Sequence, residues 1–154
     1  MTATATEQNL AGTLTKLETA LLSPPVAGEL ADWTTTVREA AATLAVDLAS
    51  FLRTILHVEY EEIARTDPEM SAQVEKLTRN DQQLLEQLAR FHEDLHALAE
   101  AAGHVPKNEG KLAEQRQRIE DDGIRLITSI RKQQAAAATW LAEAHFRDRG
   151  VAAD

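Results

Sequence analysis

The positions of the prolines constrain the fold of this chain more than any other feature of its sequence. The four prolines occur as the pair Pro24-Pro25, at Pro68 and at Pro106. Because proline lacks a backbone N–H and clashes with the preceding turn, it ends a helix or lies in its first turn. We therefore predict four helices, at residues 4–22, 26–66, 68–102 and 108–148. Short joints between long helices favour an all-α, up-down-up-down four-helix bundle, formed here by a single domain of residues 1–154.

Residues near these boundaries are typical of helix ends. Thr4 and Glu7 have the spacing of a capping box, and Gly103 fits a helix stop. Within each segment apolar residues recur every three or four positions, as they do on the buried face of a helix. The segment 26–66 is long for a bundle of this size, so we expect a kink or an overhanging end. Gly123 is a weak point at which the last helix is expected to bend or break.

Composition and charge exclude several classes of protein. The chain has no cysteine, which excludes disulfides, thiolate zinc sites, cysteine-held iron–sulfur clusters and cysteine nucleophiles. A net charge of −9 argues against a broad nucleic-acid surface, which needs a basic field. No apolar run approaches the roughly 20 residues of a membrane span. The N-terminus lacks the basic and apolar regions of a signal peptide. We expect a cytoplasmic protein with neither nucleic-acid nor membrane partners.

Helical bundles can hold metals through histidines and carboxylates that project inward, so the histidines are the first candidates. His57 and Glu61 are four residues apart, as are His92 and His96, and this spacing points two side chains the same way. His57, however, falls on the side of its helix opposite Ile55, which belongs to the apolar stripe. A solvated charged face is the simpler interpretation, since an inward ligand needs a local bulge. His92 lies at the edge of its stripe, as a half-buried histidine or part of a peripheral site.

Polar residues on the inward stripes are more informative. Asp81 interrupts the apolar stripe of the third segment, and Gln133 and Gln134 interrupt that of the fourth. Burying a polar group costs a few kcal/mol unless it is paired. In an antiparallel bundle Asp81 and Gln133 can meet at one level, where the amide would donate to the carboxylate. Two interpretations stay open: a structural polar pair at the stripe edge, or the remnant of an altered central site.

Two stretches of the chain resemble the hemerythrin-like (HHE) bundle family. Residues 74–85, with Leu77, Asp81 and Leu84-Leu85, resemble the family's third helix, where Leu-x-x-x-His-x-x-Leu-Leu is common. Residues 131–150, from Arg-Lys-Gln-Gln to Glu-Ala-His-Phe-Arg-Asp-Arg-Gly, resemble its C-terminal segment. The resemblance implies the bundle fold. It also places Asp81 and Gln133 where the family has ligand histidines, and Ala137 where a carboxylate can lie.

The register of the second helix has two versions under this resemblance. Aligned from Asp32-Trp33, the helix places Phe51 where a ligand histidine is expected. A rival register places His57 and Glu61 on the family's His-x-x-x-Glu. We prefer the first, because it keeps the apolar phase of the helix. It makes Phe51, Asp81, Gln133 and Ala137 the positions of a degenerate metal site.

The resemblance predicts the scaffold of the family, whereas these substitutions argue against its iron chemistry. The resemblance implies two irons that bind oxygen, held by five or more histidines and two carboxylates. Glutamine, alanine and phenylalanine do not replace such ligands. We therefore expect no cofactor and no enzymatic activity, but a small binding or interaction protein of unknown partner.

Two alternatives to this prediction stay open. The first is an iron protein responsive to oxygen, redox state or nitric oxide, whose altered site draws on His57, Glu61, Asp81 and His92. The second is self-association through the overhanging end of the second helix, with a homodimer as a possible form.

Overall fold

The computed structural model describes residues 2–23, 25–26, 28–104 and 109–153, and these contain helices but no strand. In chain order the helices are α1 (Thr2–Leu22), α2 (Leu30–Phe51), the π-helix η1 (Leu52–Leu56), α3 (His57–Thr66), the 3-10 helix η2 (Pro68–Met70), α4 (Ser71–His104) and α5 (Glu109–Ala153). Because α2, η1 and α3 follow one another without a break, the chain forms four long rods. The predicted all-α architecture with four helices is confirmed.

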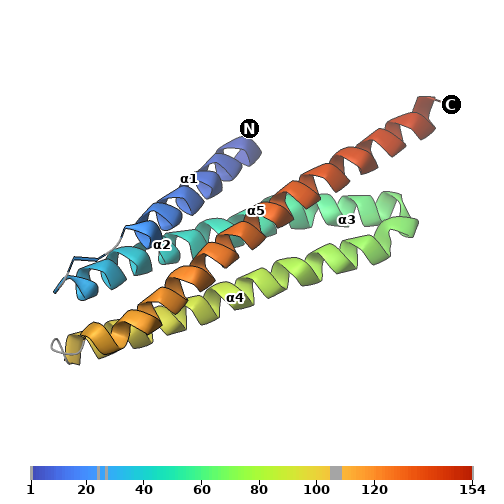
Figure 1. The fold of residues 1–154 in the computed structure, drawn as a ribbon. Helices are drawn as coiled ribbons and strands as arrows, with labels where there is room; N and C mark the ends of the chain where they lie inside the picture. The colour runs from blue at the N-terminus through green and yellow to red at the C-terminus, as the bar shows by residue number, and fades with distance from the viewer. Residues whose placement is uncertain (1, 24, 27, 105–108, 154) are drawn as a thin grey trace.

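The rods lie side by side, and successive rods run in opposite directions (Figure 1). α1 packs against α2 and α5, while α4 packs against α2, α3 and α5. α1 has 21 residues and α5 has 45, so α5 extends well beyond the N-terminus of α1 (Figure 1). The half of the bundle that contains α3 is therefore formed chiefly by α3, α4 and α5.

Apolar residues at helical spacing form one continuous core. On α1 four leucines at this spacing, Leu10, Leu14, Leu17 and Leu21, are at most 1% exposed. Full burial of one such side chain stabilises the fold by roughly 1.5–3 kcal/mol. The other rods contribute the same kind of stripe, so each helix is held by the face that it buries against its neighbours.

Several predicted helix ends are corrected by the structure. α2 begins at Leu30 and not at residue 26, because Gly28 has a φ of 91°, a left-handed conformation that ends any helix and that glycine adopts without strain. α1 already includes Thr2, so the predicted capping box at Thr4 is wrong. α5 continues to Ala153, beyond the predicted end at 148. α4 begins at Ser71, after the 3-10 helix at Pro68–Met70, and runs to His104, so the predicted bounds of 68–102 and the predicted stop at Gly103 are wrong. The proline barrier at Pro106 and the helix start at 108 lie outside the described residues.

Gly123 does not bend or break α5, which is one helix from Glu109 to Ala153. A Cβ atom at this position would lie 2.6 Å from Leu21 Cδ1 and 3.0 Å from Phe91 Cε2. The missing side chain therefore lets α1 and α4 approach α5 closely. The expectation of a weak point was wrong because packing outweighs the low helix propensity of glycine.

The second rod contains a local bulge, η1, and such a bulge is needed to turn the residues of α3 toward the core. A π-helix has i→i+5 hydrogen bonds and accommodates one extra residue, so it shifts the phase of everything that follows. Buried apolar positions on this rod are three or four apart as far as Phe51, then step by five to Leu56, and continue at Tyr60 and Ile63. Ile55, predicted to face inward, is only half-buried.

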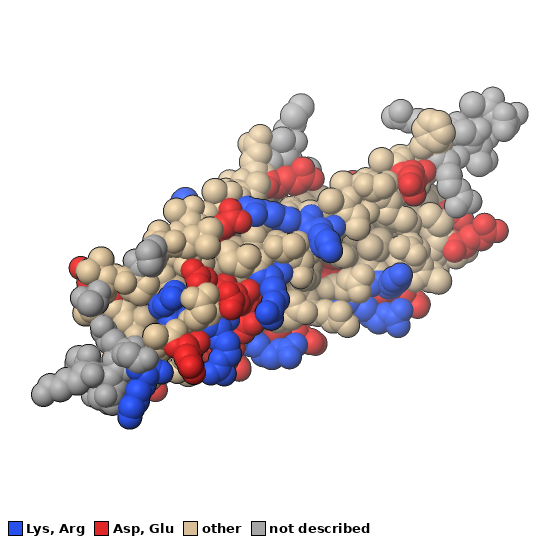
Figure 2. Space-filling view, in the orientation of Figure 1, with Lys and Arg blue, Asp and Glu red and all other residues tan. Residues whose placement is uncertain are grey.

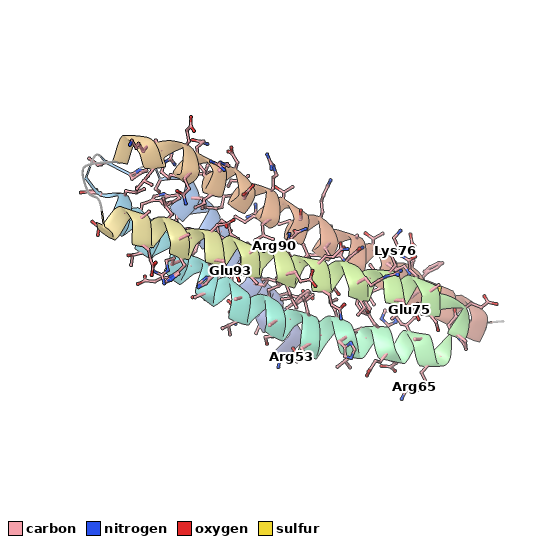
Figure 3. The ribbon with its side chains drawn as sticks, turned by 90° about the horizontal axis from the view of Figure 1, so that it is seen from below. Arg53, Arg65, Glu75, Lys76, Arg90 and Glu93 are labelled. Carbon is pink, nitrogen blue, oxygen red and sulfur yellow. The ribbon has the colours of Figure 1, made fainter. Side chains whose placement is uncertain are left out.

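Charged side chains are scattered over the outside of the bundle. Lysine and arginine are interspersed with aspartate and glutamate over the face shown in Figure 2, where no broad basic field is visible. Seen from below (Figure 3), several exposed charges lie along η1, α3 and α4: Arg53, Arg65, Glu75, Lys76, Arg90 and Glu93. The rod Leu30–Thr66 is long and apolar enough to cross a membrane, by length and composition alone. Core helices of soluble proteins share these properties, so the cytoplasmic location stays a prediction.

Candidate functional site

Asp81 is the one charged side chain in the interior of the described part of the chain. It lies on α4 and is 7% exposed. Its Oδ1 atom accepts a hydrogen bond of 3.1 Å from Nε2 of Gln133 on α5. A hydrogen bond to a charged group is stronger than one between neutral groups, and it offsets part of the cost of burying the carboxylate. The predicted meeting of Asp81 and Gln133 is confirmed.

A tyrosine and a tryptophan complete the surroundings of this pair. Tyr60 on α3 is 1% exposed, and its hydroxyl lies near Asp81 without a hydrogen bond of regular geometry. The Tyr60 ring meets the ring of Trp140 on α5 edge to face, with centroids 6.0 Å apart and planes at 73°. Such aromatic pairs add about 0.5–1.5 kcal/mol to the effect of burial alone. We call these four residues, Asp81, Gln133, Tyr60 and Trp140, the Asp81 cluster.

The environment shifts the acid–base behaviour of both ionisable groups in the Asp81 cluster. Burial raises the pKa of Asp81 from an ordinary 3.8 to about 6, while the Gln133 amide and the Tyr60 hydroxyl oppose that rise. The pKa of Tyr60 is raised as well, first by burial and then by the negative charge of Asp81. Both shifts have the same physical origin, since a low-dielectric interior disfavours the charged form.

Phe51 and Ala137 carry no group that could join this cluster chemically. Phe51 on α2 is 4% exposed, and Ala137 on α5 is 1% exposed. Both belong to the hydrophobic core. Of the four positions of the predicted degenerate site, two are therefore apolar core residues, and the other two, Asp81 and Gln133, bond to each other.

The residues of the alternative iron site are not brought together. His57 Nε2 lies 3.1 Å from Glu61 Oε1, and these side chains are 53% and 71% exposed, whereas Asp81 is buried. His92 is half-buried, and its neighbour His96 pairs with an acid one turn further along α4. Within the described part of the chain, no three His, Asp or Glu side chains are close enough to hold a metal ion.

The Asp81 carboxylate is shielded from the clefts at the surface. A cleft of about 330 Å³ between α4 and α5 is lined by Gln133 and by other polar residues such as Asn80 and Gln83, but not by Asp81. Gln133 thus lines this cleft, and its amide also bonds to the Asp81 carboxylate. A substrate in the cleft would contact Gln133 and not Asp81, so the arrangement suits a structural role for Asp81 rather than acid–base catalysis.

Sequence reasoning missed two members of the Asp81 cluster, Tyr60 and Trp140. Trp140 continues the apolar stripe of α5 between the buried residues Ala137 and Ala144, and this spacing was a readable signal. Tyr60 was hidden by the π-helix, because a regular helix would have turned it away from the core.

No protein-family model, no curated protein and no solved structure matches this chain.

Proposed function

We propose that this protein is a non-catalytic helical bundle of the hemerythrin-like type, without a di-iron centre, that acts as a small binding or interaction protein. The observation that carries the proposal is the buried hydrogen bond between Asp81 and Gln133. Under the family resemblance both positions would hold histidine ligands. Here a carboxylate and an amide satisfy each other, and neither is left to point at a metal.

The chemistry of the donor set supports the same proposal. Iron sites in bundles are built from several imidazoles and carboxylates that converge between facing helices. The interior here offers one carboxylate, already bonded to an amide, and the apolar side chains of Phe51 and Ala137. His57 and Glu61 pair with each other on the solvent side of α3. The residues present do not fit the di-iron group.

A filled interior leaves the outer surface for recognition. Asp81, the one buried acid that could act as an acid or base, is enclosed by its neighbours and lines none of the surface clefts described. The proposal therefore assigns the function of the chain to contacts made by the outer faces of its helices, and assigns no reaction to it.

Iron content tests this proposal. The untagged protein is expressed in iron-supplemented medium, and its metal content and visible absorption are measured beside those of Asp81→Ala and His57→Ala. We expect less than about 0.1 iron per chain and no charge-transfer band in all three, because metal-binding free energy needs several converging ligands. Stoichiometric iron that is lost in Asp81→Ala would contradict the proposal and favour the altered iron site. Loss only in His57→Ala would place the metal on the surface of α3.

A further inference from the structure

A groove of about 710 Å³ runs between α1 and α2, which lie side by side (Figure 1). Small side chains form most of both walls: Thr15, Thr19, Ala20 and Ser23 on α1, and Thr36, Ala40 and Thr43 on α2. From Glu29 to Thr43 the lining extends about 21 Å along α2 at 1.5 Å per residue, which is about four turns of a helix. Small side chains on two neighbouring helices allow a further helix to approach closely, as large side chains at these positions would not.

The hydroxyl groups in the groove are already satisfied. Thr15 and Ser23 donate to the carbonyl oxygens of the residues four positions earlier in α1, at 3.1 and 2.8 Å. Thr36 and Thr43 do the same in α2, at 3.0 and 3.1 Å. Because these donors bond within their own helices, an apolar surface can cover the groove without leaving them unpaired.

The charges of the groove are mostly negative. Glu29, Asp32 and Glu39 lie on the α2 side, against the single Lys16 on the α1 side, and all four side chains are exposed. None of the four makes an ion pair with another residue that the structure describes. The acids are three and seven residues apart, so they follow one edge of α2. Asp32 also suits the positive end of the helix dipole, but Glu39 lies too far along α2 for that role. An unpaired row of carboxylates favours a cationic partner.

Trp33 is the one aromatic residue in the lining of the groove. It is 6% exposed, and the guanidinium of Arg116 lies over its ring, 5.7 Å from the centroid. Its Nε1 donor is buried without a hydrogen-bond partner among the described residues. A buried donor without an acceptor costs free energy, so a partner that brings an oxygen atom to it gains affinity. Trp33 is therefore the expected anchor for whatever occupies the groove.

We propose that the α1–α2 groove binds an amphipathic helix of a partner protein, with its lysines or arginines facing the acidic edge of α2. A helix is convex and lies in a concave groove between two others, with its apolar face against the small side chains and Trp33. Its basic residues belong on the α2 side, because Lys16 would repel them on the α1 side. The acids would likewise repel nucleic acids and anionic membranes. The inference rests on the proposed function, since it names the kind of partner that an interaction protein would bind.

A synthetic helical peptide tests the groove. The probe is about 18 residues of alanine, leucine and lysine, slightly longer than the groove, with leucines on one face and lysines along one edge of that face. A second probe has glutamate in place of every lysine. Neither contains an aromatic residue, so in Trp140→Phe the fluorescence of Trp33, then the only tryptophan, reports binding. We expect the lysine peptide to bind with a Kd of about 100 μM or below, and the glutamate peptide at least about tenfold more weakly.

Neutral substitutions locate the binding. The groove variant removes the three acids of the acidic edge: Glu29→Gln, Asp32→Asn and Glu39→Gln. Its matched control removes the same number of exposed acids from α4: Glu75→Gln, Glu86→Gln and Glu93→Gln. Both variants change the net charge of the chain equally, so only the groove differs. The groove variant should bind the lysine peptide about tenfold more weakly, and the control should stay within about threefold of the starting protein.

Two single substitutions separate charge from shape. Lys16→Gln removes the one repulsive charge and should strengthen binding of the lysine peptide by about twofold. Thr36→Phe places a ring in the groove and should weaken binding at least about tenfold without removing a charge. Circular dichroism shows that each variant keeps its fold, since both side chains are exposed in the protein alone.

The outcomes separate this inference from the proposed function. No binding of the lysine peptide up to about millimolar concentration would overturn the inference. Equal binding of the two peptides, equal loss in the groove variant and its control, or unchanged binding in Thr36→Phe would also overturn it. None of these measurements depends on iron content. A bundle that holds iron would overturn the proposed function even if the peptide binds, and a metal-free bundle that ignores the peptide would overturn the groove alone.

Discussion

Replacing the buried acid of the Asp81 cluster by its neutral isostere should stabilise the protein at neutral pH. In Asp81→Asn the amide oxygen still accepts from Gln133, while the charge that burial disfavours is removed. The pKa of Asp81 is raised from 3.8 to about 6 in the folded state. A rise of about two units corresponds to about 3 kcal/mol at 1.36 kcal/mol per unit. We expect Asp81→Asn to be about 2–3 kcal/mol more stable than the wild type at about pH 7.5, since the asparagine amide itself costs something to bury.

The same argument fixes the sign of the pH dependence. A group whose pKa is higher in the folded state binds its proton more tightly there, so the proton stabilises the fold. For Asp81 this stabilisation is complete below about pH 4, is lost as the pH rises through about 6, and is absent above that. The advantage of Asp81→Asn should therefore fall to near zero at about pH 4.

Urea unfolding is monitored by far-ultraviolet circular dichroism from about pH 4 to about pH 8. It gives the difference in free energy of unfolding between the wild type and Asp81→Asn. Because both proteins share all other titrating groups, the difference isolates Asp81. Asp94→Asn, which changes an exposed acid on the same helix, is the matched control and should show no such pH dependence. An Asp81→Asn difference that is constant across this range would refute the buried, perturbed carboxylate.

Four further substitutions test the packing of the bundle by the same unfolding assay. Phe51→Ala should cost about 3–5 kcal/mol, because the ring is 4% exposed in the core; a near-neutral effect would contradict its place there. Gly123→Ala should destabilise the fold by about 1–3 kcal/mol, because the added Cβ would lie 2.6 Å from Leu21 Cδ1. Gly12→Ala is the control: its added Cβ would meet no atom within 4 Å, so it should stabilise the fold by up to about 1 kcal/mol. Equal effects of the two substitutions would refute the close approach of the helices at Gly123. Gln133→Leu should cost about 1–3 kcal/mol at neutral pH and shift the pH-dependent loss of stability upward, since its hydrogen bond lowers the pKa of Asp81; an unchanged pH profile would contradict that bond.

Much of the fold could be predicted from local rules. Proline positions and apolar spacing determine where helices end and which faces they bury, and these properties depend on short stretches of sequence. The Asp81–Gln133 hydrogen bond was predictable for a related reason. Two polar residues on inward stripes of antiparallel helices need partners, and each was available to the other.

What could not be predicted depends on the rest of the molecule. The π-helix η1 has no distinctive sequence signal, and its i→i+5 bonds are maintained by the packing that it allows, in which Leu56 and Tyr60 take inward positions. The predicted bend at Gly123 was wrong because this glycine allows close packing against Leu21 and Phe91. These residues lie about a hundred and about thirty positions earlier in the chain. The groove between α1 and α2 likewise requires two helices to be placed side by side before its walls can be recognised.

The central claim, that the bundle is complete without a metal, is tested most directly by thermal unfolding before and after dialysis against a strong chelator. Helix content and melting temperature should be unchanged, because the buried Asp81 carboxylate is held by the Gln133 amide of the same chain. A large loss of helix, or a fall in melting temperature that added iron reverses, would contradict the claim and show that metal binding contributes to folding.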